Sequence, residues 1–123
     1  MAHEIRQIDH VQLAMPVGGE AAAEAFYGDV LGLAMVPKPE PLASRGGRWF
    51  GDGPVCLHLG ADKDFRPARK AHPALVIDDL DALVASLGAA GHPVEWDTDL
   101  PGVRRCNVDD PFGNRIELMA AKH

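Results

Sequence analysis

The chain has 123 residues, of which 46% are hydrophobic and 24% are charged, a composition typical of one soluble globular domain with a core of its own. Eighteen acidic against twelve basic side chains give a net charge of -6, which argues against a general binder of nucleic acid or of anionic membranes. No apolar run approaches the ~18 residues of a spanning helix, and the polar start lacks the apolar region of a signal peptide. We therefore expect a cytoplasmic protein without a membrane segment.

The first half of the chain predicts a βαβββ unit. Polar and apolar residues alternate over 5–15, which indicates a strand with His10 on one face, and Pro16 ends it. Apolar residues then recur at helical spacing from Ala23 to Leu31, and Gly32 is a suitable helix end. Three further strands are expected at 33–37, 48–50 and 54–59, with a proline-rich loop over 38–45.

The second half repeats this pattern. A strand is expected at 72–77, Asp78 is a candidate N-cap, and apolar residues at helical spacing over 80–87 predict a helix that ends before Gly91. Strands at 93–96 and 103–108 follow, and the turn Asp110-Pro-Phe-Gly-Asn114 leads to a last strand that carries Glu117. We predict a single domain over 1–123, with module 1 at 5–60, a polar linker at 61–71 and module 2 at 72–120.

The two halves agree in spacing as well as in element order. From His10 to Gly32 is 32 − 10 = 22 residues, and from His72 to Gly91 is 91 − 72 = 19. From His10 to His58 is 48 residues and from His72 to Glu117 is 45, which is again a difference of three. A duplicated unit with one three-residue insertion explains both differences and matches His58 with Glu117.

Four polar residues consequently occupy matched places, namely His10, His58, His72 and Glu117. If the modules curve toward each other, imidazoles and a carboxylate meet, and this set suits one divalent ion such as Zn, Fe, Mn, Ni or Co with open positions for a ligand. Each residue also has a simpler interpretation. A histidine on a strand is often only hydrogen-bonded, and Glu117 could pair with Arg115, Arg104 or Arg105 across the hairpin.

Several other side chains are candidates for ligand binding or chemistry. Arg66, Arg69 and Arg105 could hold an anionic group, although a solvated linker and a charged edge strand also explain them. Trp49 and Phe112 could line an apolar pocket, or simply belong to the core. Cys56 should face the same side of its strand as His58, so nucleophilic catalysis is an alternative use of that pair.

Three stretches carry a resemblance to a known family: Ile8–Leu13, Phe26–Leu33 and Asp109–Leu118. Together they resemble the vicinal oxygen chelate superfamily, which includes glyoxalase I, extradiol dioxygenases, fosfomycin-resistance enzymes, methylmalonyl-CoA epimerase and bleomycin-binding proteins. The resemblance covers nearly the whole chain. It implies an α+β fold of two βαβββ modules in an open, curled mixed sheet around a metal, and commonly a homodimer with its cleft within one chain or between two.

Carried over to this sequence, the resemblance implies metal ligands at His10, His72 and Glu117, with His58 at the fourth position. In glyoxalase I the fourth position resembles a second glutamate, so the histidine here does not match a proton shuttle made of two carboxylates. The His, His, Glu set resembles that of the dioxygenases and fosfomycin-type transferases, in which the fourth position is not normally a ligand, so the resemblance also allows His58 to be a general acid or base. We expect a metal-dependent lyase, isomerase, dioxygenase or transferase in which Glu117 or His58 moves a proton on a small substrate that could be anionic. The alternatives are a non-catalytic protein that sequesters a drug or metabolite, and a metal with a structural role.

Overall fold

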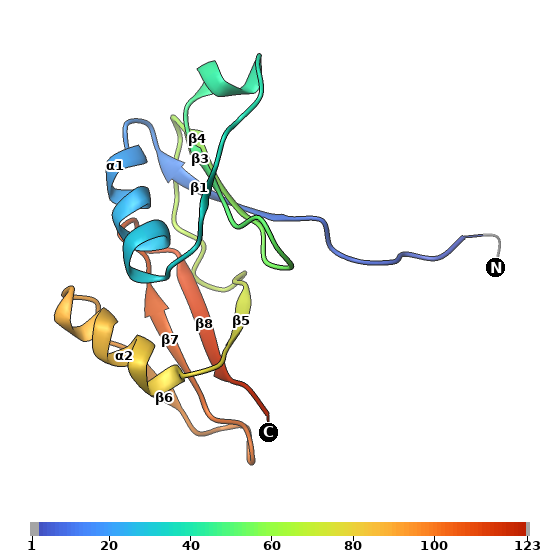
Figure 1. Cartoon of the computed structure of the whole chain (residues 1–123). Coiled ribbons are helices and arrows are strands. Elements are labelled where there is room, and N and C mark those ends of the chain that lie inside the picture. Colours follow the sequence, from blue (N-terminus) through green and yellow to red (C-terminus); the bar gives the residue numbers. More distant parts are fainter. Residues whose placement is uncertain (1–2, 123) are drawn as a thin grey trace.

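The computed structural model describes residues 3–122, which form two modules of alternating strands and helices (Figure 1). The first module consists of β1 (Val11–Pro16), α1 (Glu20–Ala23), the π-helical turn η1 (Glu24–Val30), β2 (Met35–Val36), the 3-10 turn η2 (Leu42–Arg45), β3 (Arg48–Phe50) and β4 (Leu57–Asp62). The second consists of β5 (Ala74–Ile77), α2 (Leu80–Ala89), β6 (Glu95–Asp97), β7 (Arg105–Asp109) and β8 (Arg115–Ala120).

Each module contributes one four-stranded mixed sheet. The strand orders are β1-β4-β3-β2 and β5-β8-β7-β6, with the first pair of each sheet parallel and the other pairs antiparallel. The expected α+β class with two open βαβββ modules is confirmed. Within residues 3–122, no helix is both long and apolar enough to cross a membrane.

The internal duplication predicted from the spacing is visible in the strand register. Gln12 pairs with His58 in the first sheet, and Ala74 pairs with Glu117 in the second. Each of these pairs lies two residues beyond the histidine that opens its module, so His10 and His72 occupy equivalent places. Because side chains two residues apart on a strand share a face, each histidine lies on the same face as the polar residue of the last strand.

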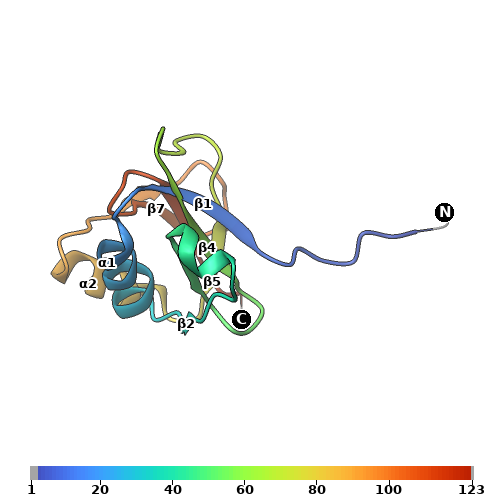
Figure 2. The same ribbon diagram turned by 90° about the horizontal axis from the view of Figure 1, so that it is seen from above.

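Some expected element boundaries were wrong. The first strand was expected from residue 5, but pairing with β4 begins only at Val11, and toward the N-terminus the chain extends away from the body (Figures 1 and 2). The strand expected at 54–59 lies three residues later. The N-cap of α2 is Asp79 rather than Asp78, because the Asp79 side chain accepts a hydrogen bond from the Ala82 amide at 3.0 Å.

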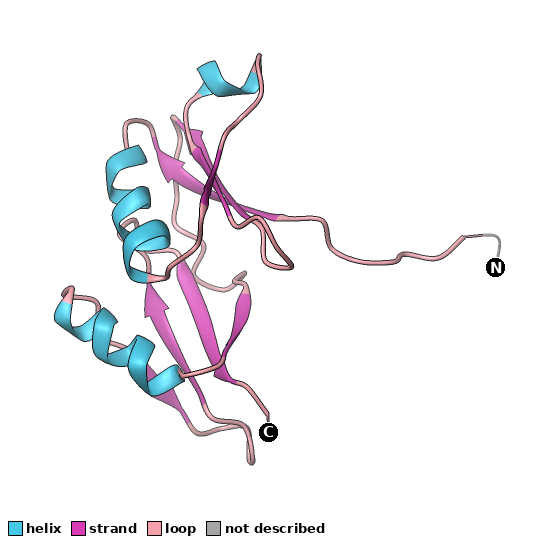
Figure 3. Ribbon diagram, viewed as in Figure 1, coloured by secondary structure: helices cyan, strands magenta, loops and turns pink. Residues whose placement is uncertain are grey.

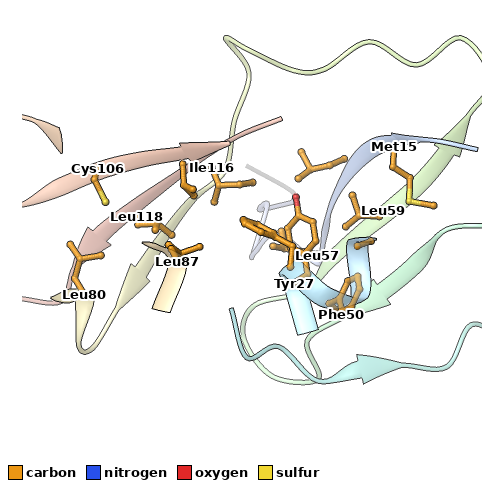
Figure 4. Packing of buried hydrophobic residues seen from close by; sticks show 14 residues of the cluster. Met15, Tyr27, Phe50, Leu57, Leu59, Leu80, Leu87, Cys106, Ile116 and Leu118 are labelled. Carbon is orange, nitrogen blue, oxygen red and sulfur yellow. The ribbon is translucent and has the colours of Figure 1, made fainter. Parts of the chain in front are cut away.

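The helices cover only one face of the two sheets (Figure 3). The core fills the space beneath them and includes Met15, Phe26 and Tyr27 from the first module and Leu87 and Leu118 from the second (Figure 4). In β8, Ile116 and Leu118 face this core while the alternating Arg115, Glu117 and Met119 face the other way. The faces that carry the four candidate residues are therefore the open faces of the sheets.

A buried polar network joins the two modules at the last hairpin. The Asp110 carboxylate accepts hydrogen bonds from the Phe112 and Asn114 amides, from the Asn114 side chain and from the Tyr27 hydroxyl, the last at 2.6 Å. Asn114 also donates to the Ala14 carbonyl at 2.8 Å and accepts from the Ala68 amide at 2.9 Å. Both side chains are fully or almost fully buried, so every polar atom needs these partners.

Replacing Asn114 with alanine should lower the free energy of unfolding by about 3 kcal/mol, because it leaves buried acceptors and a buried donor without partners. Urea denaturation of Asn114→Ala, with Asn107→Ala on the open face as the matched control, measures this. A loss of less than about 1 kcal/mol in Asn114→Ala would contradict a structural role for the network.

The Tyr27 hydroxyl should resist ionisation in the folded protein. Burial raises its pKa far above the ordinary value, and the adjacent Asp110 carboxylate raises it further. A raised folded pKa contributes stability below the unfolded value of about 10 that is lost as pH rises beyond it. Tyr27 is the only tyrosine in the chain, so tyrosinate absorbance reports this group alone. We expect no tyrosinate signal until circular dichroism shows unfolding, whereas ionisation near pH ~10 in the folded protein would contradict the buried hydrogen bond.

Candidate metal site divided between the two modules

On the open face of the first module, three aromatic rings lie in one stack. The His58 ring lies between Trp49, with ring centroids 4.2 Å apart and planes at 7°, and His10, with centroids 4.2 Å apart and planes at 16°. The register explains this arrangement, since Trp49 and His58 are directly paired across β3 and β4. The stack therefore holds two of the four candidate ligands face to face.

Parallel rings restrict how these two histidines can bind metal. The nitrogen lone pair of an imidazole lies in the ring plane, and a zinc–nitrogen bond is about 2.0–2.1 Å long. An ion placed between two stacked rings would lie far out of both planes. In this arrangement one of the two histidines can bind the ion and the other can lie beside it, but both cannot bind the same ion.

The contacts of His10 favour it as the ligand. Its Nδ1 lies 2.9 Å from the Asp9 carboxylate, which can only accept, so Nδ1 carries the proton and Nε2 is free to bind. His58 is more enclosed, and burial lowers its pKa below the usual value, with the charge of His10 lowering it further. The lowered pKa of His58 favours the neutral imidazole, which has a ring nitrogen able to accept a proton.

On the open face of the second module, the Glu117 carboxylate lies between two partners. Its Oε1 is 2.9 Å from His72 Nε2, and its Oε2 accepts from Arg105 Nη1 at 3.2 Å. Arg105 also pairs with Asp97 at 3.2 Å. The Glu117 residue is only 8% exposed, so these partners offset the cost of burying its charge. Of the arginines considered as partners for Glu117, Arg105 is the one in contact.

The hydrogen bonds of the two His72 ring nitrogens make the His72–Glu117 pair suitable for binding a cation. Its Nδ1 lies 2.8 Å from the Lys70 carbonyl oxygen, which can only accept, so Nδ1 carries a proton. The other nitrogen, Nε2, then presents either a second proton or a lone pair to the Glu117 oxygen. Two acceptors at 2.9 Å need a positive charge to bridge them. A proton fits on the line between them, whereas a divalent ion, with bonds of about 2.0–2.2 Å to each atom, would lie to one side of that line. The donor set of imidazole and carboxylate suits a divalent ion.

The four candidate residues thus form two pairs rather than one cluster. Within residues 3–122, no three His, Cys, Asp or Glu side chains are grouped closely enough to hold a metal ion. A cavity of about 670 Å³ between the modules is lined by both His10 and His72, together with Arg66 and mainly apolar residues of β1 and β5. Within one chain, each module therefore holds two of the four predicted ligands.

The predicted substrate-binding residues do not form one site in the structure. Trp49 belongs to the stack and Arg66 lines the cavity between the modules. Arg69 pairs with Asp109 at 2.8 Å and donates to the Gly113 carbonyl, while Arg105 is held by Glu117 and Asp97. Phe112 packs on the core cluster beside Gly19. The Cys56 thiol donates to the Gly53 carbonyl at 3.4 Å.

The whole arrangement corresponds to one known family. The profile of the Glyoxalase/Bleomycin resistance protein/Dioxygenase superfamily matches residues 7–118. The chain belongs to this superfamily. The predicted resemblance is confirmed.

Solved structures of the superfamily fit the whole chain. A putative glyoxalase family protein from Bacillus anthracis is 47% identical, with a TM-score of 0.93 over 99% of this chain and 100% of its own. A lactoylglutathione lyase from Agrobacterium tumefaciens is 26% identical, with a TM-score of 0.66 over 90% of this chain and 92% of its own. The fosfomycin resistance protein FosX from Listeria monocytogenes shares the fold at 15% identity, with a TM-score of 0.75 over 97% of this chain and 96% of its own. No match was found among curated proteins.

Proposed function

We propose that this chain is a divalent-metal enzyme of the superfamily, acting on a small molecule with two neighbouring oxygen atoms. The observation that carries the proposal is the His72–Glu117 pair, in which a histidine with its Nδ1 proton fixed by the Lys70 carbonyl points Nε2 at a carboxylate. His10, oriented by Asp9 in the same manner, supplies a third ligand. The ion could be Zn, Fe, Mn, Ni or Co, since each accepts nitrogen and oxygen ligands.

We further propose that the complete site forms between two copies of the chain. Both open sheet faces lie on the side away from the helices (Figures 1 and 3). In one of the two-fold arrangements open to such surfaces, the first module of one copy lies against the second module of the other, and this is the arrangement that we propose. His10 of one copy would then meet His72 and Glu117 of the second.

Exposed apolar side chains support such a homodimer. Ile5 is 95% exposed and Ile8 is 76% exposed on the segment that leaves the body before β1. Val76 is 67% exposed on the edge strand β5, and it faces the same way as His72. Large apolar side chains exposed on an extended segment and on an unpaired sheet edge mark surfaces that another chain can cover. A second copy would bury them together with the divided site.

The chemistry required of the side chains follows from their contacts. The bound ion would act as a Lewis acid that polarises the substrate oxygens and stabilises negative charge on them. His58, neutral near physiological pH, can take a proton from the substrate at a ring nitrogen and return it. Arg105 holds Oε2 of Glu117 and so orients the Oε1 atom toward His72. Whether the reaction is a lyase, isomerase, dioxygenase or transferase step depends on the substrate.

A second candidate function is the non-catalytic sequestering of a small molecule. The cavity of about 670 Å³ between the modules favours it, because its walls are mainly apolar and such cavities bind drug-sized ligands. A metal chelator would not change the affinity of a ligand bound in this cavity. Binding or turnover that needs a divalent ion favours the enzyme instead, and loss of stability on chelation without turnover indicates a structural ion.

Replacing Glu117 with glutamine should weaken metal binding about a hundredfold or more, because it removes the charged ligand while preserving size. Titration of the chelator-treated protein with Zn, Mn, Co, Ni or anaerobic Fe(II), followed by elemental analysis, measures this. Glu95→Gln is the matched control, since Glu95 lies exposed on β6 of the same sheet. The proposal fails if the parent protein takes up none of these ions, or if Glu117→Gln binds them as tightly as the parent.

A further inference from the structure

A second recess, of about 590 Å³, extends from the His10 ring along the first module. It is lined by the stacked rings of His10, His58 and Trp49 and by the segment that carries Lys38 and Arg45. The recess therefore contains a proposed metal ligand and two cations in one lining. Neither cation was singled out by the sequence patterns, because both belong to an irregular proline-rich loop.

The charge of this recess is opposite to that of the protein as a whole. The chain carries a net charge of -6, yet the recess contains two cations and a single acidic side chain, Asp9, which already accepts a hydrogen bond from His10. The ion pairs formed by arginines among residues 3–122 involve Arg48, Arg69, Arg104 and Arg105, and not Arg45. An electropositive hollow in an acidic protein attracts anions.

The loop that carries these cations is held in place by the backbone. Gly47 has a φ of +86°, and a Cβ at that position would lie 2.1 Å from the Leu59 carbonyl oxygen, so only glycine lets the loop pass this close to β4. The Lys38 ammonium donates to the Gly46 carbonyl and keeps two further N–H groups. Lys38 also lines the same recess as His58 and Trp49. Lys38 is thus fixed beside the stack.

We propose that this recess binds an oxyanion of the substrate, such as a carboxylate, phosphate or phosphonate, with Lys38 and Arg45 as its cationic contacts and Trp49 as an aromatic wall. The two cations give charge-assisted hydrogen bonds, and the wall suits a flat or unsaturated group next to the anion. The inference deepens the proposed function by naming a substrate class. It also assigns anion binding to the first module, whereas Arg69 and Arg105 are occupied by carboxylates of their own.

The test uses the chelator-treated protein and two probes, phenylphosphonate and the neutral benzyl alcohol, in calorimetric titrations. We expect phenylphosphonate to bind at least about tenfold more tightly than benzyl alcohol, and each of Arg45→Gln and Lys38→Gln to weaken it about fivefold to tenfold. Lys63→Gln, which removes an exposed cation outside the recess, should leave the affinity unchanged. Phenylphosphonate should also change the fluorescence of the parent but not of Trp49→Phe, which retains Trp96.

Equal binding of the two probes would overturn the inference, as would equal losses in Lys63→Gln and Arg45→Gln. Arg45 lies exposed at the end of η2, so its replacement should leave folding intact and keeps the test decisive if Lys38→Gln is unstable. Because no metal is present in these titrations, failure of metal uptake by the parent protein leaves their result unaffected. The proposed function and the oxyanion subsite can therefore fail separately.

Discussion

A carboxylate on a buried strand needs positive partners, and the position of Glu117 imposes this constraint on the second module. Its neighbours in β8, Ile116 and Leu118, are buried in the core, so the strand cannot move to expose the charge. Arg105 satisfies one oxygen and His72 the other. Removing either partner would leave one oxygen of this buried carboxylate without a hydrogen bond.

The same arrangement explains why the site is divided. Each module places the histidine that precedes its first strand beside the polar residue of its last strand, in agreement with the matched register. In the second module this yields a histidine and a carboxylate, whose opposite characters suit a cation. In the first module it yields two histidines, which stack on each other and on Trp49. The duplication therefore produces a second module with a pair suited to a cation and a first module with a stack of flat aromatic rings.

Much of the fold could be predicted from the sequence because periodicity and spacing are local properties. The interval from His10 to His58 and that from His72 to Glu117 predicted the equivalence of the four residues that the strand register shows. The start of the first strand could not be predicted in this way. Residues 5–10 alternate like a strand, but β4 offers partners only from Val11 onward.

Side-chain partners were harder to predict than elements. The choice of Arg105 rather than Arg104 for Glu117 depends on strand parity, and Arg104 instead lies over the Trp96 ring and pairs with Asp81. Lys38 and Arg45 belong to a loop whose path depends on how closely Gly47 approaches β4, which no periodic pattern encodes. The network of Asp110, Asn114 and Tyr27 joins residues 83 apart in sequence and needs the folded chain to be seen.

The most direct test of the divided site is to mix two variants, His10→Ala and Glu117→Gln, each of which should bind metal poorly alone. If the site forms between copies, a heterodimer of the two contains one site with both defects and one intact site. Refolding them together should then restore about one tightly bound ion per heterodimer, measured by elemental analysis after separation of differently tagged chains. Tight binding that never recovers in the isolated heterodimer would contradict a site shared between two copies.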